Sequence, residues 1–511
     1  MSTLSERLRH WADCQPDAIA LISPETGRLI RYGELFDQTR QLAGFLAAFG
    51  IDRGRHVGLY LQNGLQTTRL FLSIMSAGYL ATPFNLLSQR DQLAWVLDHS
   101  DCDLVFYGAA QKEMLTAAIA KMKRRLRIIQ IDADAAELVI FEADVPDYRA
   151  TDFEIADPAQ PALLMYTSGT TGTPKGVRLS HANLAHAAKS VSSWHGLGPA
   201  DRVLSSLPIY HINGQSIATV TPCYSGGSIV AAQKFSVSQW WSAVREHQCT
   251  WINMVPTIIA YLLNAKDGPD APKADDLRFV RFGRSASAPL PPEHHRAFEE
   301  RFGIAVIEAM GMTESASVVF CNPHDKRRRY GSPGLPCGVE ARVISPTGEA
   351  LPSGETGELC LRGANVMDGY YKSADETRKA FDEKGWLRTG DLGYRDADGF
   401  YFVTGRLKEL IIKGGENIAP REIDEALLGH PAVLDAACVG IADANYGQEI
   451  IAFVILKEGA PCSDQELREF CISALGKFKT PRDFHFVADL PRGASGKVQR
   501  LRLIEGMAQA R

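Results

Sequence analysis

Residues 165 to 177 read MYTSGTTGTPKGV, a stretch in which hydroxyl side chains and glycines surround one lysine. The serine and threonines supply side-chain hydroxyls, and the glycines allow backbone N–H groups to approach a ligand closely. Lys175 adds a positive charge that suits phosphate. The apolar run ALLMY at residues 162–166 predicts a buried strand before the loop. A strand, a donor-rich loop and a lysine together predict a site for a triphosphate.

This loop differs from the Walker A phosphate loop, G-x-x-x-x-G-K-[ST]. Counted from Gly169, Pro174 stands where that pattern has its second glycine, and Gly176 stands where it has serine or threonine. We therefore predict a different kind of phosphate loop. The alternative is a surface turn rich in glycine and threonine, which the length of the stretch and the strand before it disfavour.

Length, charge and cysteine use limit the class of protein. A chain of 511 residues exceeds the size at which one core keeps growing, so we expect two or more domains. A net charge of −5 gives no reason to expect a nucleic-acid partner. The basic runs at residues 121–127 and 325–330 predict solvated faces, with a contact to an anionic cofactor as the alternative. Ten cysteines occur singly, without zinc spacing, and predict reduced thiols.

Neither a signal peptide nor a membrane span is predicted. The first residues, MSTLSERLRHWADC, carry charges throughout, and no later apolar run approaches the roughly 20 residues that cross a bilayer. We expect a cytoplasmic protein. The sequence leaves both a monomer and a homodimer open.

The residue pattern changes twice along the chain. The first 150 residues alternate helix-like and strand-like segments, which predicts a layered α/β architecture with parallel strands. From Gly331, turn residues separate short strands and predict a β-rich subdomain. After Arg406, two helices and two strands fit a separate small domain. We predict a mixed α/β fold, with a large domain of βαβ subdomains and the β-rich part at residues 1–407 and a small, mobile α+β domain at residues 408–511.

Six further motifs follow the loop in order. They are LPIYHING (207–214), SASAPL (285–290), GMTES (311–315), RTGD (388–391), GRLKELIIKGGENIAPREID (405–424) and PRGASGKVQR (491–500). In order and spacing, over essentially the whole chain, the series resembles the adenylate-forming superfamily of acyl-CoA synthetases, peptide-synthetase adenylation domains and firefly-type luciferases. The resemblance implies that MgATP and a carboxylic acid form acyl-AMP and pyrophosphate, and that a thiol then attacks the acyl-AMP.

The resemblance also implies roles in nucleotide binding. Mg²⁺ would be held by Glu314 with Thr167, in keeping with its preference for hard oxygen ligands. Asp391 would accept hydrogen bonds from the ribose, and Arg406 would reinforce it. The phosphates would contact Thr167, Ser168, Gly169, Thr170, Thr171 and Lys175, and the rest of the nucleotide would contact Ser287, Ala288, Met310, Gly311, Met312 and Thr313.

Lys497 would carry the first step, because an ammonium between the attacking carboxylate and the departing pyrophosphate stabilises the charge there. A solvated surface lysine is the alternative. Lys408 falls at the family's hinge position, so the small domain would rotate between steps. Gly414 and Gly415 would then let the backbone approach the thiol arm. The catalytic set implied by the resemblance is Lys497, Glu314, His211 and Thr167.

The acyl pocket is the least defined part of the prediction. His211 resembles the family's gate to the thiol tunnel, with a core histidine as the alternative. Arg284 would suit a second carboxylate on the acid, as in relatives that act on short dicarboxylic or carnitine-like polar acids, with a salt bridge inside the protein as the alternative. Met310 and the segment GRSASAPL depart from the family pattern and leave the acid open. The residues expected to bind the acid are His211, Asn213, Arg284, Ser285 and Gly311.

We predict an AMP-forming carboxylic acid–CoA ligase that uses ATP, Mg²⁺ and coenzyme A and acts on a short, polar or dicarboxylic acid. The alternatives are a stand-alone enzyme that loads an acyl carrier protein and a ligase for fatty or aryl acids. Coenzyme A is favoured because no carrier-like segment follows residue 500. A luciferase-like oxygenase lacks any sign of a luciferin site, and a non-enzymatic module would have little reason to combine Lys497, Glu314 and Asp391.

Overall fold

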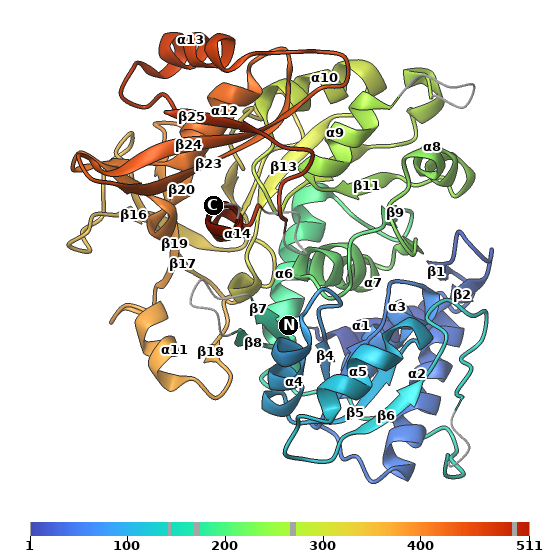
Figure 1. Cartoon of the computed structure of the whole chain (residues 1–511). Helices are drawn as coiled ribbons and strands as arrows, with labels where there is room; N and C mark the ends of the chain where they lie inside the picture. Colours follow the sequence, from blue (N-terminus) through green and yellow to red (C-terminus); the bar gives the residue numbers. More distant parts are fainter. Residues whose placement is uncertain (1, 142–144, 168–173, 266–271, 493–497, 510–511) are drawn as a thin grey trace.

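The middle of the chain, together with two strands from near the N-terminus, forms a nine-stranded sheet (Figure 1). The computed structural model describes residues 2–141, 145–167, 174–265, 272–492 and 498–509. The strands of this sheet are β1 (Ile19–Ile22), β2 (Leu29–Arg31), β9 (Arg202–Ser205), β10 (Ser228–Ala231), β11 (Trp251–Met254), β12 (Phe282–Ser285), β13 (Val306–Met310), β14 (Phe320–Cys321) and β15 (Leu335–Pro336). Their order is β15-β14-β13-β12-β11-β9-β10-β1-β2, and the strands from β13 to β1 are parallel.

Helices cover both faces of this sheet, as its mainly apolar parallel strands require. Side chains of α8 (Val237–Glu246), α9 (Pro256–Asn264) and α10 (Pro292–Phe302) form one core with Ile252 and Val306. On the other face, Trp251, Phe282 and Ile307 share a core with three further helical elements. These are α6 (His181–His195), the π-helix η2 (Asn213–Val220) and α7 (Thr221–Ser225).

The second sheet contains the strand predicted before the phosphate loop. Its strands are β3 (His56–Tyr60), β4 (Leu80–Pro83), β5 (Cys102–Tyr107), β6 (Arg127–Gln130), β7 (Pro161–Thr167), β8 (Lys175–Ser180) and β18 (Gly369–Tyr370). Their order is β18-β8-β7-β4-β3-β5-β6. The pairs β18–β8 and β8–β7 are antiparallel, and the other pairs are parallel. The α/β layering predicted for the first 150 residues is therefore confirmed.

The N-terminal helices pack against these two sheets. The helix α3 is buried along its whole length, between elements of both sheets. At α1, Thr3 and Glu6 form a reciprocal capping box that satisfies free N–H groups of the first turn. The helical elements of the N-terminal part are α1 (Leu4–Cys14), α2 (Tyr32–Ala48), α3 (Leu65–Ser76), α4 (Arg90–His99), η1 (Ala109–Gln111) and α5 (Lys112–Ile119). Two short elements, η3 (Ala274–Leu277) and η4 (Thr313–Ser315), follow later in the chain.

A smaller antiparallel sheet follows, which confirms the β-rich subdomain. It contains β16 (Glu340–Ile344), β17 (Gly357–Arg362), β19 (Leu387–Arg395) and β20 (Tyr401–Arg406), in that order. The helix α11 (Ala374–Ala380) lies between β18 and β19 in the chain.

The last part of the chain forms a small α+β domain with a core of its own, drawn in orange and red in Figure 1. It contains η5 (Leu407–Glu409), β21 (Ile411–Lys413), β22 (Glu416–Ile418), α12 (Pro420–Leu428), β23 (Val433–Asp443), β24 (Gly447–Leu456), α13 (Asp464–Leu475), β25 (Asp483–Phe486) and α14 (Arg500–Gln509). The boundary between residues 407 and 408 stays a prediction. Along the described chain, no helix combines the length and the apolar character of a membrane span.

His181, the first residue of α6, gives the fold a pH dependence. Its side chain is buried, and neither ring nitrogen has a hydrogen-bond partner within the described residues. Burial lowers the pKa of His181 from 6.5 to about 4. As the pH falls below 6.5, the unfolded chain gains a proton that the folded chain takes up only near pH 4, so acid destabilises the fold in this window.

We expect the variant His181→Gln to lose part of this acid sensitivity. Between pH 6 and 5, the free energy of unfolding of the wild type should fall more steeply than that of the variant, by up to about 1.4 kcal/mol per pH unit. Urea unfolding of both proteins at pH 7, 6 and 5 measures the two slopes. Equal slopes would show that His181 does not carry the effect.

Candidate active site

The parallel strands β11, β12 and β13 end at one edge of the large sheet, where open α/β sheets hold their ligands. The register aligns Asn253 of β11 with Arg284 of β12, so both side chains lie on one face. Asn213 of η2 covers that face, and its Oδ1 accepts hydrogen bonds from Arg284 Nη1 and Asn253 Nδ2, each at 3.2 Å. Asn213 Nδ2 donates to Ser287 Oγ at 3.2 Å. We call these four residues the Arg284 cluster.

Arg284 keeps hydrogen-bonding capacity that the protein does not use. Its side chain is 0% exposed, and Nε and Nη2 lack a hydrogen-bond partner within the described residues. Among the described residues, no carboxylate forms an ion pair with Arg284. They therefore do not support the alternative of an internal salt bridge. Burial lowers the pKa of Arg284, and the neighbouring thiols of Cys321 and Cys337 oppose that shift. Unpaired buried donors are costly, which makes Arg284 a candidate for binding an anionic ligand.

Two other residues predicted to bind the acid, His211 and Ser285, are close to this cluster in the chain. His211 is half-buried in the turn before η2, and its Nδ1 accepts a hydrogen bond from the backbone N–H of Asn213 at 3.3 Å. Ser285 lies on the opposite face of β12 from Arg284, because successive side chains alternate along a strand. Its backbone, rather than its hydroxyl, lies beside the cluster.

The loop after β12 carries Ser287 and Ala288, both half-buried. Ser287 has a φ of 76°, in the left-handed region that residues other than glycine seldom adopt. The hydrogen bond from Asn213 to its hydroxyl stabilises this conformation. Such local strain is often found at ligand sites.

The GMTES turn begins where β13 ends, next to β12 in the sheet. At Gly311 a Cβ atom would lie 2.2 Å from the carbonyl oxygen of Ser317, so only glycine allows this close backbone approach. Met310 and Met312 are half-buried and Thr313 is buried. The turn therefore leads from the Arg284 cluster to Glu314.

Glu314 and Lys175 meet the segment around β18. The hydroxyl of Tyr370 donates to Glu314 Oε1 at 3.0 Å, and the Lys175 ammonium lies 5.0 Å from the centre of the Tyr370 ring. Lys175 also forms an ion pair with Glu376 of α11. Thr167, at the end of β7, donates to the Lys175 carbonyl at 3.5 Å. Four residues predicted for the phosphates, Ser168, Gly169, Thr170 and Thr171, lie outside the described residues.

Asp391 and Arg406 face each other across β19 and β20. They are aligned in the strand register, and Arg406 Nε donates to Asp391 Oδ1 at 2.8 Å. The charge of Asp391 raises the pKa of Arg406, and the charges of Glu409 and Glu314 add to this. Arg406 therefore interacts electrostatically with both Asp391, the carboxylate predicted to bind the ribose, and Glu314, the carboxylate predicted to bind Mg²⁺. Lys408 follows in η5 as an exposed residue.

Gly414 and Gly415 form the turn between β21 and β22, with φ values of 57° and 84° that favour glycine. Two exposed aromatic residues, Tyr446 and Phe478, flank this turn. A Cβ atom at Gly414 would lie 3.4 Å from each ring. Lys497 lies outside the described residues.

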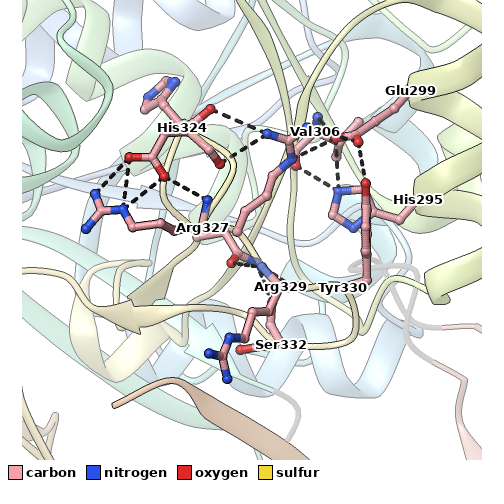
Figure 2. A network of polar contacts seen from close by, with 11 residues as sticks. His295, Glu299, Val306, His324, Arg327, Arg329, Tyr330 and Ser332 are labelled. Atoms are coloured by element: carbon pink, nitrogen blue, oxygen red, sulfur yellow. Dashed lines mark hydrogen bonds and ion pairs between the residues drawn. The ribbon is translucent and has the colours of Figure 1, made fainter. Parts of the chain in front are cut away.

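The basic run at residues 325–330 is tied into the protein by its own contacts (Figure 2). Arg328 donates to both carboxylate oxygens of Glu299 in α10, each at 3.0 Å. Arg329 pairs with Asp396, in the turn between β19 and β20. The run thus links α10 to the antiparallel sheet. The prediction of a solvated face is wrong at Arg328, whose side chain is largely buried by this link.

Four residues of the site were not predicted. Tyr370 and Glu376 reach Lys175 through the pairing of β18 with β8, a long-range contact that leaves no local pattern in the sequence. Tyr446 and Phe478, in contrast, do show a local pattern in the sequence. Each is a large aromatic residue among polar and glycine neighbours, in NYGQ and GKFK. This pattern is a weak signal, because single apolar residues are common at protein surfaces.

Comparison with known proteins places this arrangement in a family. Residues 8–371 match the AMP-binding enzyme family, and residues 422–497 match the AMP-binding enzyme C-terminal domain. The chain belongs to the AMP-binding enzyme family. The resemblance to adenylate-forming enzymes is thereby confirmed. The roles of individual residues stay predictions.

Three known proteins show how far this AMP-binding enzyme resembles its relatives. It is 52% identical over 490 residues to sulfoacetate–CoA ligase of Cupriavidus necator, covering 96% of this chain and 95% of that protein. It is 34% identical over 506 residues to oxalate–CoA ligase of Arabidopsis thaliana, covering 98% and 97%. The ATP-bound crystal structure of MatB from Rhodopseudomonas palustris has a TM-score of 0.89, with 30% identity and 98% of both chains covered.

Proposed function

We propose that this AMP-binding enzyme is an ATP-dependent acid–CoA ligase for a short carboxylic acid that carries a second anionic group, with sulfoacetate as the leading candidate. The observation that carries the proposal is the buried guanidinium of Arg284, which has two unused donors beside Asn213 and no described carboxylate as a partner. The similarity to a sulfoacetate–CoA ligase and an oxalate–CoA ligase supports it, because both named acids have two acidic groups.

The reaction has two steps. In the first, a carboxylate oxygen of the acid attacks the α-phosphorus of ATP, the bond to pyrophosphate breaks, and acyl-AMP forms. Lys175 would hold the outer phosphates, and Lys497 would stabilise the charge that gathers on the attacking and leaving oxygens. In the second, the thiol sulfur attacks the acyl carbon, AMP leaves with the electron pair, and the thiol proton goes to solvent.

The residues around Glu314 fit a magnesium ion bound with ATP. Mg²⁺ is commonly held by one or two carboxylates together with substrate phosphates and water. Glu314 offers one half-buried carboxylate, oriented by the Tyr370 hydroxyl, and the described residues contain no metal cage of three His, Cys, Asp or Glu side chains. A bound Mg²⁺ would neutralise phosphate charge. Glu314 would act as its ligand, with Thr167 at the end of β7 nearby in the fold.

Arg284 would select the acid by its second charge. A sulfonate or carboxylate at the far end of a short acid can accept hydrogen bonds from the Nε–H and Nη2–H groups of Arg284. These groups would otherwise stay unpaired in the buried site. A fatty or aryl acid leaves them unpaired, and unpaired buried donors disfavour its binding.

Coenzyme A is the proposed acceptor. The exposed fractions of Tyr446 and Phe478 are 47% and 39%, and both rings border the Gly414 turn, which would meet the thiol arm. Stacking of a purine on exposed aromatic rings contributes about 1–3 kcal/mol. These rings would thus bind the adenine of coenzyme A. A pantetheine arm on a carrier protein has no adenine to place there.

We expect Tyr446→Ala to raise the KM for coenzyme A by about fivefold to a hundredfold, because the stacking surface is lost. Acid-dependent exchange between ATP and pyrophosphate should stay at the wild-type rate, since it precedes thiol binding. Tyr261→Ala, at an exposed aromatic residue of α9, is the matched control. An unchanged KM for coenzyme A would remove Tyr446 from the acceptor site.

The proposed acid is tested by ATP–pyrophosphate exchange with pairs of acids that differ in their second group. Sulfoacetate is compared with acetate, and oxalate with glycolate. Exchange driven mainly by the doubly acidic member of each pair supports the proposal. Exchange driven equally well by acetate, or best by benzoate, would contradict it.

A further inference from the structure

Lys175, which the proposed function assigns to binding the outer phosphates of ATP, forms an ion pair with Glu376. Lys175 is the first residue of β8, and Glu376 lies in the first turn of α11, far away in the sequence. Their side chains are 23% and 30% exposed. Glu376 thus places a carboxylate against the lysine that follows the phosphate loop.

The backbone holds Glu376 in this position. Gly369 and Tyr370 of β18 pair with β8, and the Tyr371 N–H donates to the Gly176 carbonyl at 2.7 Å. Thr377 then ties α11 to this strand, because its hydroxyl accepts a hydrogen bond from the Tyr370 N–H at 2.9 Å. Figure 1 shows α11 and β18 beside β8. The sheet pairing therefore places the backbones of Glu376 and Lys175 so that their side chains can meet.

Glu376 has a second partner ready on its own helix. Its Oε1 accepts a hydrogen bond from Lys379 Nζ at 2.7 Å, while its Oε2 meets Lys175. Hydrogen bonds from Lys175 and then Lys379 lower the pKa of Glu376 to about 2. The carboxylate is therefore charged at every pH at which the enzyme is expected to work, and it can stay paired with Lys379 after losing Lys175.

We propose that Glu376 sets the affinity for ATP, because its carboxylate forms an ion pair with Lys175 that a phosphate group of ATP must displace. A single ammonium carries one positive charge, so a carboxylate and a phosphate compete for it. The inference rests on the proposed function in one respect, the assignment of Lys175 to the outer phosphates of ATP. The opposite role, in which Glu376 aims Lys175 at the phosphates, predicts the opposite change in affinity.

The test is the dissociation constant of MgATP, measured by calorimetry without acid or coenzyme A, for the wild type and Glu376→Gln. We expect the variant to bind ATP about twofold to fivefold more tightly, the effect of removing one partly exposed ion pair. AMP lacks the outer phosphates, so its dissociation constant should not change. The control is Asp375→Asn, which removes an exposed neighbouring carboxylate paired with Arg378 and should leave both constants unchanged.

Unchanged or weaker ATP binding by Glu376→Gln would overturn this inference. An equal gain for ATP and AMP would also overturn it, because the effect would then not involve the outer phosphates. Acyl-CoA formation by the wild type, measured in parallel, separates the two proposals. Turnover without a change in ATP affinity contradicts only the role of Glu376, whereas tighter ATP binding by the variant without any wild-type turnover contradicts only the proposed function.

Discussion

Replacing Lys497 with alanine is expected to slow acyl-AMP formation by about 10²-fold to 10³-fold or more, the cost of losing a group that stabilises transition-state charge. The attacking carboxylate and the departing pyrophosphate are both anionic, so the step needs a cation between them. Thioester formation from supplied acyl-AMP should stay close to the wild-type rate, because it requires no such cation. The two half-reactions, measured separately as pyrophosphate exchange and as thioester formation, give the two rates.

The chain after Lys497 is anchored within the small domain at Arg500. Three residues later, Arg500 Nη2 donates to Asp424 Oδ2 at 2.5 Å, and its Nη1 donates to the Cys438 carbonyl at 2.7 Å. Lys477→Ala, at an exposed lysine of the same domain, is the control for a general loss of positive charge. Equal losses in both half-reactions would contradict the division of labour.

Replacing Arg284 with leucine is expected to reduce kcat/KM for sulfoacetate by about 30-fold to 10³-fold, because the second anion would then be buried without a partner. Acetate has no second charge, so its kcat/KM should change less than about threefold. The preference for sulfoacetate over acetate, measured with each acid in the same assay, is the quantity that the variant should lose.

A nearby arginine offers a matched control. Arg281 lies three residues before Arg284, but its guanidinium pairs with Asp201 at 2.5 Å. Arg281→Leu removes the same charge from the same segment and should leave the acid preference unchanged. Thermal unfolding of both variants separates a loss of selectivity from a loss of folded protein. An unchanged preference in Arg284→Leu would show that Arg284 does not contact the acid.

Local patterns predicted much of the secondary structure. The helix expected from DQELREFCISAL covers residues 464–475, because the Ser463 side chain caps its first turn and the chain turns at Gly476. The strand expected before the phosphate loop lies within β7, where a run of apolar residues is buried on both faces. Periodicity and caps act over a few residues, which is why sequence analysis finds them.

Contacts between distant segments could not be predicted in the same way. The pairing of Tyr370 with Val177 depends on the assembled sheet, so the partners of Lys175 could be found only in the structure. The same holds for Arg284. It lies on β12, and no local pattern in the sequence says which face of that strand meets η2. Motif resemblance supplied the candidate residues, and tertiary packing decides which of them meet.

The most direct test of the account is mass spectrometry of the products formed by the purified enzyme with MgATP, coenzyme A and equal concentrations of sulfoacetate, oxalate, acetate and benzoate. The account predicts sulfoacetyl-CoA as the main thioester, formed together with AMP in equal amounts. Acetyl-CoA or benzoyl-CoA as the main product, or no thioester from any of the four acids, would contradict it.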